Sequence, residues 1–168
     1  PTATMHHADN PLLQPWDTPY GLPPFAQIRA EHFEPALSEA MAAHQRELQA
    51  IAAQSEPPSF DNTLAAYDAS GRQLSRISAA YFNLCASETS PALQAVQRAM
   101  AGPLAAHSNA IYLNQALFDR IDALHRRRHE LGLDSQALRL LERVHLDFVR
   151  AGARLEGTAR QRYAQVME

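Results

Sequence analysis

Two histidines four residues apart form the segment that most suggests metal chemistry. His125 and His129 flank three arginines, and residues four apart on a helix face the same side, as in the His-Glu-x-x-His zinc motif. That motif needs a carboxylate directly after the first histidine to take a proton from the metal-bound water. Arg126 occupies this position, and a guanidinium cannot act as a base. Because three cations also oppose a divalent ion, we interpret the segment as a solvated helix end.

The remaining candidates for chemistry are better explained as structural residues. His44, His107 and His145 lie on or beside apolar stripes, where a histidine with one satisfied hydrogen bond is common. Cys85 lies among small and apolar residues without a histidine close in sequence, which favours a core thiol over a nucleophile. No Gly-x-Ser-x-Gly, phosphate-binding glycine loop or Cys-x-x-Cys is present. We therefore assign no catalytic, cofactor-binding or metal-binding residue.

Composition narrows the class of protein. The 168 residues are 46% apolar and 20% charged, which is too apolar for a disordered chain and sufficient for a core. No apolar run approaches the roughly 20 residues that cross a bilayer, and no signal-peptide pattern is visible in the residues after Pro1. Acidic residues outnumber the 15 basic ones, 18 to 15, so we expect no nucleic-acid partner and no membrane partner.

The apolar residues predict an all-α fold. The chain contains 31 Ala and 20 Leu but nine Ile and Val together, a balance that favours helices over strands. Apolar side chains recur at intervals of three and four, and they predict about six helices in an antiparallel, bundle-like lobe. The expected helices are residues 31–53, 60–87, 91–111, 114–131, 135–155 and a sixth from residue 158.

Polar residues, glycine and proline predict the ends of these helices. Ser90, Asn114 and either Asp134 or Ser135 are expected to cap helices, and the segment 59–62 offers a further cap. We expect a kink at Pro103, since a proline inside a helix costs about 3 kcal/mol. Gly152 is expected to mark a close approach to a neighbouring element.

The first part of the chain is expected to be extended. Residues 1–24 hold six of the 11 prolines, too closely spaced for a helix to propagate. The same segment carries Leu12, Trp16 and Tyr20, more apolar surface than a solvated tail would expose. We therefore divide the chain into a Pro-rich arm, residues 1–30, docked on a helical domain, residues 31–168.

Five stretches in register identify a family. They are residues 10–13 (NPLL), 29–36 (RAEHFEPA), 60–64 (FDNTL), 104–114 (LAAHSNAIYLN) and 147–155 (DFVRAGARL). In this order and at these separations they resemble the N-terminal part of bacterial peptidyl-dipeptidases, in the thimet oligopeptidase and neurolysin family of zinc metallopeptidases. The resemblance extends from Asn10 to about Tyr163.

The resemblance implies a function for the complete enzyme. Family members are mostly helical, with two lobes around a channel that admits short unstructured peptides, and a zinc ion on the channel floor. Peptidyl-dipeptidases release C-terminal dipeptides, and the glutamate of His-Glu-x-x-His acts as base toward the zinc-bound water. This motif is absent from residues 1–168. We therefore expect this region to help wall the channel, to hold no zinc and to be inactive by itself.

Two further expectations concern partners and location. The predicted sixth helix carries Tyr163, Val166 and Met167 without a stop signal, so we expect the isolated chain to self-associate there. The family's usual location and the lack of a visible signal favour the cytoplasm. The alternative is a free-standing helical interaction module without enzymatic activity, and a reading frame continuing into His-Glu-x-x-His would exclude it.

Overall fold

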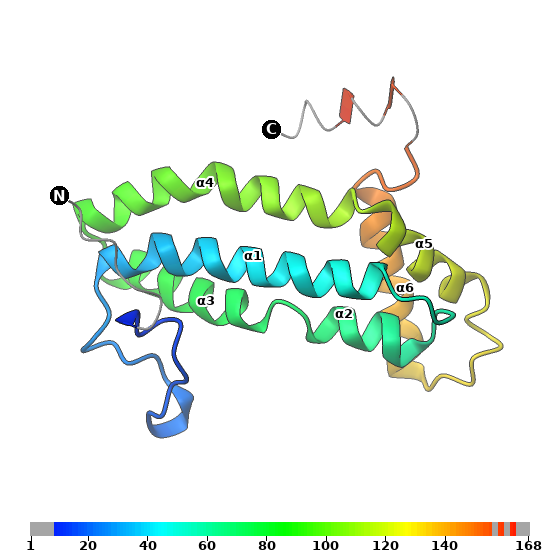
Figure 1. Ribbon diagram of the computed structural model, residues 1–168, viewed down its shortest axis with the longest axis horizontal. Coiled ribbons are helices and arrows are strands. Elements are labelled where there is room, and N and C mark those ends of the chain that lie inside the picture. The colour runs from blue at the N-terminus through cyan, green and yellow to red at the C-terminus, as the bar shows by residue number, and fades with distance from the viewer. Residues whose placement is uncertain (1–8, 156–157, 160–161, 164–168) are drawn as a thin grey trace. The chain divides into compact units, whose positions relative to one another are not determined.

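The computed structural model describes residues 9–155, 158–159 and 162–163, and these residues are helical or irregular with no strand (Figure 1). The prediction of an all-α fold is confirmed. The α-helices are α1 (Phe33–Ala52), α2 (Ala66–Ala69), α3 (Arg72–Ser87), α4 (Pro91–Tyr112), α5 (Gln115–Arg126) and α6 (Ser135–Arg150). Two 3-10 turns, Pro19–Gly21 and Ala30–His32, and a π-helical segment, Phe60–Ala65, complete the elements. None of the described helices combines the length and the apolar character needed to cross a bilayer.

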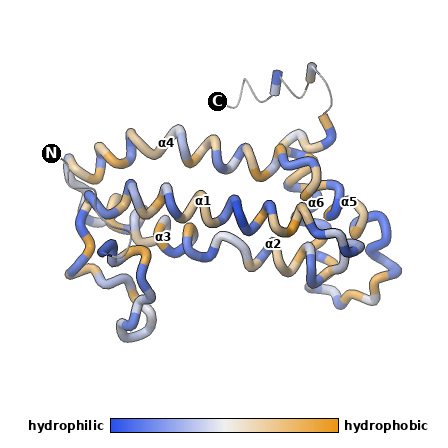
Figure 2. The backbone as a smooth tube through the Cα atoms, viewed as in Figure 1, coloured by the Kyte–Doolittle hydropathy of each residue, from blue (hydrophilic) through white to orange (hydrophobic). Residues whose placement is uncertain are grey.

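The chain divides into two compact units. Of the described residues, those up to residue 44 and residues 71–103 form the first unit, and residues 45–70 and those from residue 104 onward form the second. In both units the apolar positions recur among polar ones along the helices, as the hydropathy colours of Figure 2 show. The division into an arm of residues 1–30 and a helical domain stays a prediction.

The core of the first unit joins the arm to the helices. Phe33 and Tyr81 pack with ring centroids 5.1 Å apart, and the Tyr81 hydroxyl donates to the carbonyl of Leu93 at 3.1 Å. Leu12 of the arm is fully buried. Further buried apolar residues of this unit are Ala36, Leu37, Ala40, Ile77, Ala80, Val96 and Met100. Burying these side chains is the main force that holds the unit together.

The predicted helix caps are confirmed. The side chain of Ser90 accepts from the amide of Leu93 at 3.2 Å, and that of Asn114 accepts from Leu117 at 3.0 Å. Asp134 caps α6 by accepting from two amides, at 3.0 and 2.8 Å. Ser59 caps the π-helical segment, since its hydroxyl accepts from the amide of Asn62. Each cap satisfies amides that have no partner within their own helix.

A break at residues 70–71 corrects the second predicted helix. The sequence predicted one helix from about residue 60 to Ser87, but α2 ends at Ala69 and α3 begins at Arg72. Ser70 is extended, and Gly71 has a φ of 69°, the left-handed conformation that favours glycine. The apolar spacing continues across the break, and periodicity alone therefore could not detect it.

Replacing Gly71 by Ala is expected to lower the free energy of unfolding by about 1–3 kcal/mol. An added Cβ would lie 2.8 Å from two ring atoms of His44, in addition to the positive φ. Urea unfolding of both chains measures the loss. Gly132→Ala is the matched control, because Gly132 also has a positive φ, 63°, with no neighbour within 4 Å. Equal losses at the two positions would contradict a role for the His44 contact.

Helix α6 ends earlier than predicted. It was expected to continue through Leu155, but it stops at Arg150. Gly152 has a φ of 87°, its amide donates to the carbonyl of Val149, and the next amide donates to Phe148. These two bonds form a Schellman stop. The expected close approach of a neighbouring element to Gly152 is also present, because an added Cβ would lie 3.3 Å from the ring of Tyr163 in the helical residues 162–163.

Three other expectations have mixed outcomes. Helix α5 was expected to extend to residue 131 but ends at Arg126. Helix α4 continues through Pro103 as one helix, and the kink expected at this proline stays a prediction. Residues 158–159 and 162–163 are helical, but Val166 and Met167 lie outside the described residues. The expected contact through the sixth helix therefore stays a prediction.

Candidate functional site

The two histidines singled out from the sequence do not share a helix. His125 lies in the last turn of α5, which ends at Arg126, and His129 is exposed in the turn that follows. The spacing argument for a metal pair therefore does not apply to them. The structure instead brings His125 close to a residue of α6.

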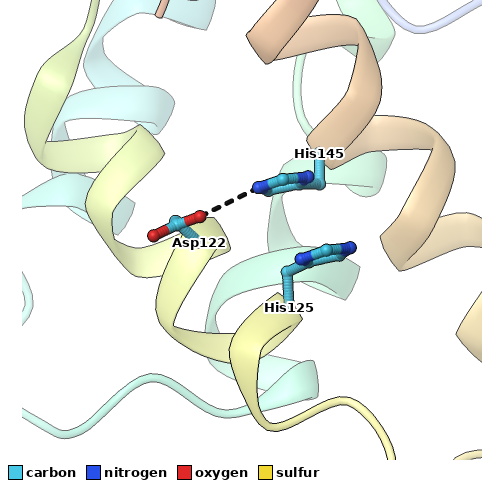
Figure 3. A group of neighbouring side chains, drawn as sticks. All are labelled: Asp122, His125 and His145. Atoms are coloured by element: carbon cyan, nitrogen blue, oxygen red, sulfur yellow. Dashed lines mark hydrogen bonds and ion pairs between the residues drawn. The ribbon is translucent and has the colours of Figure 1, made fainter. Parts of the chain in front are cut away.

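A cluster of two histidines and an aspartate joins α5 to α6 (Figure 3). Nε2 of His145 lies 2.9 Å from Oδ1 of Asp122. The rings of His125 and His145 are stacked, with centroids 3.7 Å apart and planes 1° from parallel. His145 also stacks on Phe118, with centroids 5.7 Å apart. Asp122 and His145 are buried, whereas His125 is half-buried.

Arginines surround the carboxylate of this cluster. Arg126 lies 2.6 Å from Oδ2 of Asp122, and Arg154 lies 3.7 Å from Oδ1. Burial acts to raise the pKa of Asp122, but the hydrogen bond from His145 and the charge of Arg126 outweigh it and hold the pKa below its ordinary value. Asp122 is therefore ionised at neutral pH. Since a carboxylate only accepts, Nε2 of His145 carries the proton of their hydrogen bond.

The residues of the cluster do not fit a metal ion in this arrangement. Their ligand atoms lie within 4.8 Å of one another, which makes them the natural candidates. However, Nε2 of His145 carries the proton of its hydrogen bond to Asp122, and the in-plane lone pairs of the two stacked rings lie in parallel planes, so they do not converge on one ion. Arg126 and Arg154 add positive charge beside the carboxylate. We therefore interpret the cluster as a group of polar side chains that holds α5 against α6, and we call it the polar lock.

The cluster predicts a pH dependence of stability. Burial lowers the pKa of His125, His145 and Arg128 lower it further, and Asp122 and Glu142 oppose them without reversing the shift. The unfolded chain therefore binds more protons than the folded chain as the pH falls below about 6.5. We expect the free energy of unfolding to fall between pH 7.5 and pH 5.5, as measured by urea unfolding.

His125→Gln tests this assignment. Without the imidazole, the decline in stability between the two pH values is expected to become smaller. His129→Gln is the control, because His129 is exposed and outside the stacked pair. An unchanged decline in the His125 variant would show that another group carries the pH dependence.

A buried arginine was missed in the sequence analysis. Arg120 of α5 is 8% exposed, and its side chain donates to the π-helical segment and the loop before it. Nη1 donates to the carbonyls of Gln54 and Glu56 at 3.1 and 3.0 Å. Nε donates to Thr63 and Nη2 to Asn62, at 3.2 and 3.0 Å. The only signal in the sequence was its position three residues after Leu117, on the apolar face of α5.

The other candidates from the sequence are dispersed. His44 lies against Gly71, while His107 and Cys85 are half-buried and the Cys85 thiol is free. His145 is the one of these residues that lies in the cluster with Asp122. The assignment of no catalytic, cofactor-binding or metal-binding residue within this chain stays a prediction.

Comparisons with known proteins were made at the level of sequence. No protein-family model matches the chain. It is 44% identical over 146 residues to dipeptidyl carboxypeptidase of Salmonella typhimurium, a match that covers 87% of the chain and 22% of the relative. Dipeptidyl carboxypeptidase of Escherichia coli is 42% identical over 146 residues, covering 87% of the chain and 21% of the relative. Oligopeptidase A of Salmonella typhimurium is 26% identical over 157 residues, a match that covers 94% of the chain and 22% of the relative.

These relatives are much longer than the chain. Residues 1–168 span about a fifth of the length of the dipeptidyl carboxypeptidases, and the match covers most of the chain itself. Identity above 40% over 146 residues cannot come from shared helical composition. The chain is therefore homologous to part of bacterial dipeptidyl carboxypeptidase, and the resemblance predicted from its motifs is confirmed.

Proposed function

We propose that these 168 residues are the N-terminal helical region of a zinc-dependent peptidyl-dipeptidase that cleaves short peptides. The observation that carries this proposal is the 44% identity to a dipeptidyl carboxypeptidase over 87% of the chain. The catalytic zinc and its ligands would lie in the part of the enzyme outside these residues.

The region's own role is to form part of the wall of the substrate channel. Its side chains support a scaffold role better than a chemical one, because the Asp122, His125 and His145 cluster is already occupied by internal interactions. Arg120 likewise donates four hydrogen bonds to residues of its own unit. A rigid wall excludes folded proteins from the channel and admits extended peptides.

Activity and metal content test the proposal. The full-length enzyme is expected to release C-terminal dipeptides from an N-acylated tetrapeptide and to hold one zinc per chain, as measured by mass spectrometry of the metal. Residues 1–168 alone are expected to release no dipeptide and to retain no zinc after mild chelation. Full-length protein that binds zinc but cleaves no peptide would contradict the proposed activity.

A matched pair of variants controls for adventitious metal. His125→Gln and His129→Gln in the 168-residue chain are expected to leave its zinc content at the background of the parent chain. One tightly held zinc per chain that both substitutions remove would overturn the assignment of the chemistry to the rest of the enzyme.

A further inference from the structure

Exposed apolar side chains gather on one segment of the first unit. Among the described residues, five large apolar side chains are mainly exposed, and three of them lie within six positions of the arm. Tyr20 is 99% exposed, Leu22 55% and Phe25 44%. The fourth, Phe82, follows Ala79 by three positions on α3, and the fifth, Leu146, belongs to the second unit. Single exposed apolar residues are ordinary, but a contiguous group indicates an interaction site.

Three hollows open beside these side chains, and Phe25 lines all of them. The largest, about 620 Å³, lies where the arm meets α3 and the start of α4, with Phe33, Leu84 and Leu93 in its wall. A second, about 370 Å³, is formed by residues 18–19 and 22–27 of the arm itself. The third, about 340 Å³, lies between the arm and the Ala79 side of α3. We name the half-buried Trp16 and the exposed residues Tyr20, Leu22, Phe25 and Ala79 the arm surface.

The start of the arm, residues 10–16, is held in place by specific contacts. The side chain of Asn10 donates to the carbonyl of His32 at 2.9 Å and accepts from the amide of Leu12. The guanidinium of Arg76 lies 4.3 Å from the centre of the Trp16 ring and donates to the carbonyls of Leu12 and Gln14. These contacts fix the Trp16 end of the arm surface, and a side chain already ordered in this way loses little conformational entropy when it binds.

The backbone at Tyr20 supports an external contact. Its φ is 61°, a left-handed conformation that costs energy in a residue with a side chain. Hydrogen bonds from the amides of Gly21 and Leu22 to the carbonyls of Thr18 and Pro19 hold this turn, and it leaves the Tyr20 side chain 99% exposed. Strain of this kind persists where the surroundings require it.

The chemistry of the arm surface indicates an apolar occupant. No charged residue lines the hollow of residues 18–19 and 22–27, and the one cation beside the third hollow, Arg76, is engaged by Trp16 and two carbonyls. The largest hollow is lined by one residue of each charge, Arg29 and Glu88, so it carries no excess of positive charge that would suit an acidic peptide or a phosphate backbone. The dipeptidyl carboxypeptidases have nearly four-fifths of their length outside the match, and a segment in the same chain binds at high effective concentration.

We propose that the arm surface is the docking surface for apolar side chains of the full-length peptidase that lie outside these 168 residues. This inference rests on the proposed function. It assigns a contact with the rest of the enzyme to the arm, in addition to the contact expected through the sixth helix. The arm thereby fixes this region to the rest of the enzyme.

Hydroxyl-radical footprinting of the full-length enzyme and of residues 1–168 tests the proposal. Oxidation of Tyr20, Leu22 and Phe25, read by mass spectrometry of peptides, is expected to fall by about fivefold or more in the full-length enzyme, because interface cores exclude solvent. Leu146, which is 41% exposed in the second unit, is the internal reference. Equal oxidation of the arm in both proteins would overturn the proposal, even if the enzyme is active.

Substitutions add a second measurement. Leu22→Asp and Phe25→Asp are expected to lower the Tm of the full-length enzyme while changing that of residues 1–168 much less, since both side chains are largely exposed there. Similar losses in both proteins would overturn the proposal. Protection of the arm in the short chain that rises with its concentration would identify a second copy as the occupant and also overturn it. A natural protein of 18.6 kDa by mass would overturn this inference and the proposed function together.

Discussion

Replacing Arg120 by Met is expected to lower the free energy of unfolding by about 2–4 kcal/mol. Met fills a similar volume without donors, so the substitution removes hydrogen bonds while retaining most of the packing. The carbonyls of Gln54 and Glu56 and the side-chain oxygens of Thr63 and Asn62 lose a charged donor. Thr63 is fully buried, so water cannot replace the lost partner there. Urea unfolding followed by circular dichroism measures the change.

Two variants separate the hydrogen bonds from the charge. Arg120→Lys retains the positive charge, but a single ammonium cannot reach four acceptors at once, so most of the loss is expected to remain. Arg98→Met is the control, because Arg98 is exposed on α4, and its effect should lie within about 0.5 kcal/mol. Full recovery of stability in the Lys variant would show that charge alone, and not the geometry of the guanidinium, is required.

Local features of the fold were predictable from the sequence. Caps such as Asn114 and Asp134 act over two or three residues, so their chemistry is visible without knowledge of the tertiary structure. The all-helical class follows from the excess of Ala and Leu over β-branched residues. The family followed from five stretches in register, since their joint order is far more specific than any one of them.

Long-range features were not predictable in the same way. Gly71 falls in a position where the apolar stripe continues, and its role depends on a left-handed backbone and on contact with His44, 27 positions earlier. Arg120 bonds to residues 57 to 66 positions away, and His145 to a residue 23 positions away. Neither pairing leaves a local pattern, because periodicity reports which face of a helix is buried and not which polar groups meet there.

Because periodicity does not report which polar groups meet, the sequence also could not predict how the histidines are paired. The sequence drew attention to His125 and His129 because they are four residues apart, yet α5 ends between them. His145 was expected to be a satisfied histidine on an apolar stripe, and it is buried and hydrogen-bonded. What could not be seen was its partner, Asp122, which lies on a different helix, 23 positions earlier in the chain.

Replacing Asp122 by Ala is expected to lower the free energy of unfolding by about 3 kcal/mol. The truncation leaves Nε2 of His145 without its acceptor in a side chain that is 7% exposed. It also leaves Arg126 and Arg154 beside each other without the carboxylate that both contact. Asp119→Ala is the matched control on the same helix, because Asp119 is exposed and its carboxylate accepts from the side chain of Gln115. A loss of about 0.5 kcal/mol is expected there.

A double-mutant cycle with His145→Ala shows whether the loss comes from this pair. Because the two side chains share one buried hydrogen bond, removing the second costs less once the first is gone, and a coupling energy of about 1–2 kcal/mol is expected. Strictly additive losses would contradict a direct interaction. Since the hydrogen bond from His145 and the charge of Arg126 hold the pKa of Asp122 below its ordinary value, the coupling is expected to be present at neutral pH and to decrease when acid protonates the carboxylate. The polar lock would then be shown to depend on the charge of Asp122.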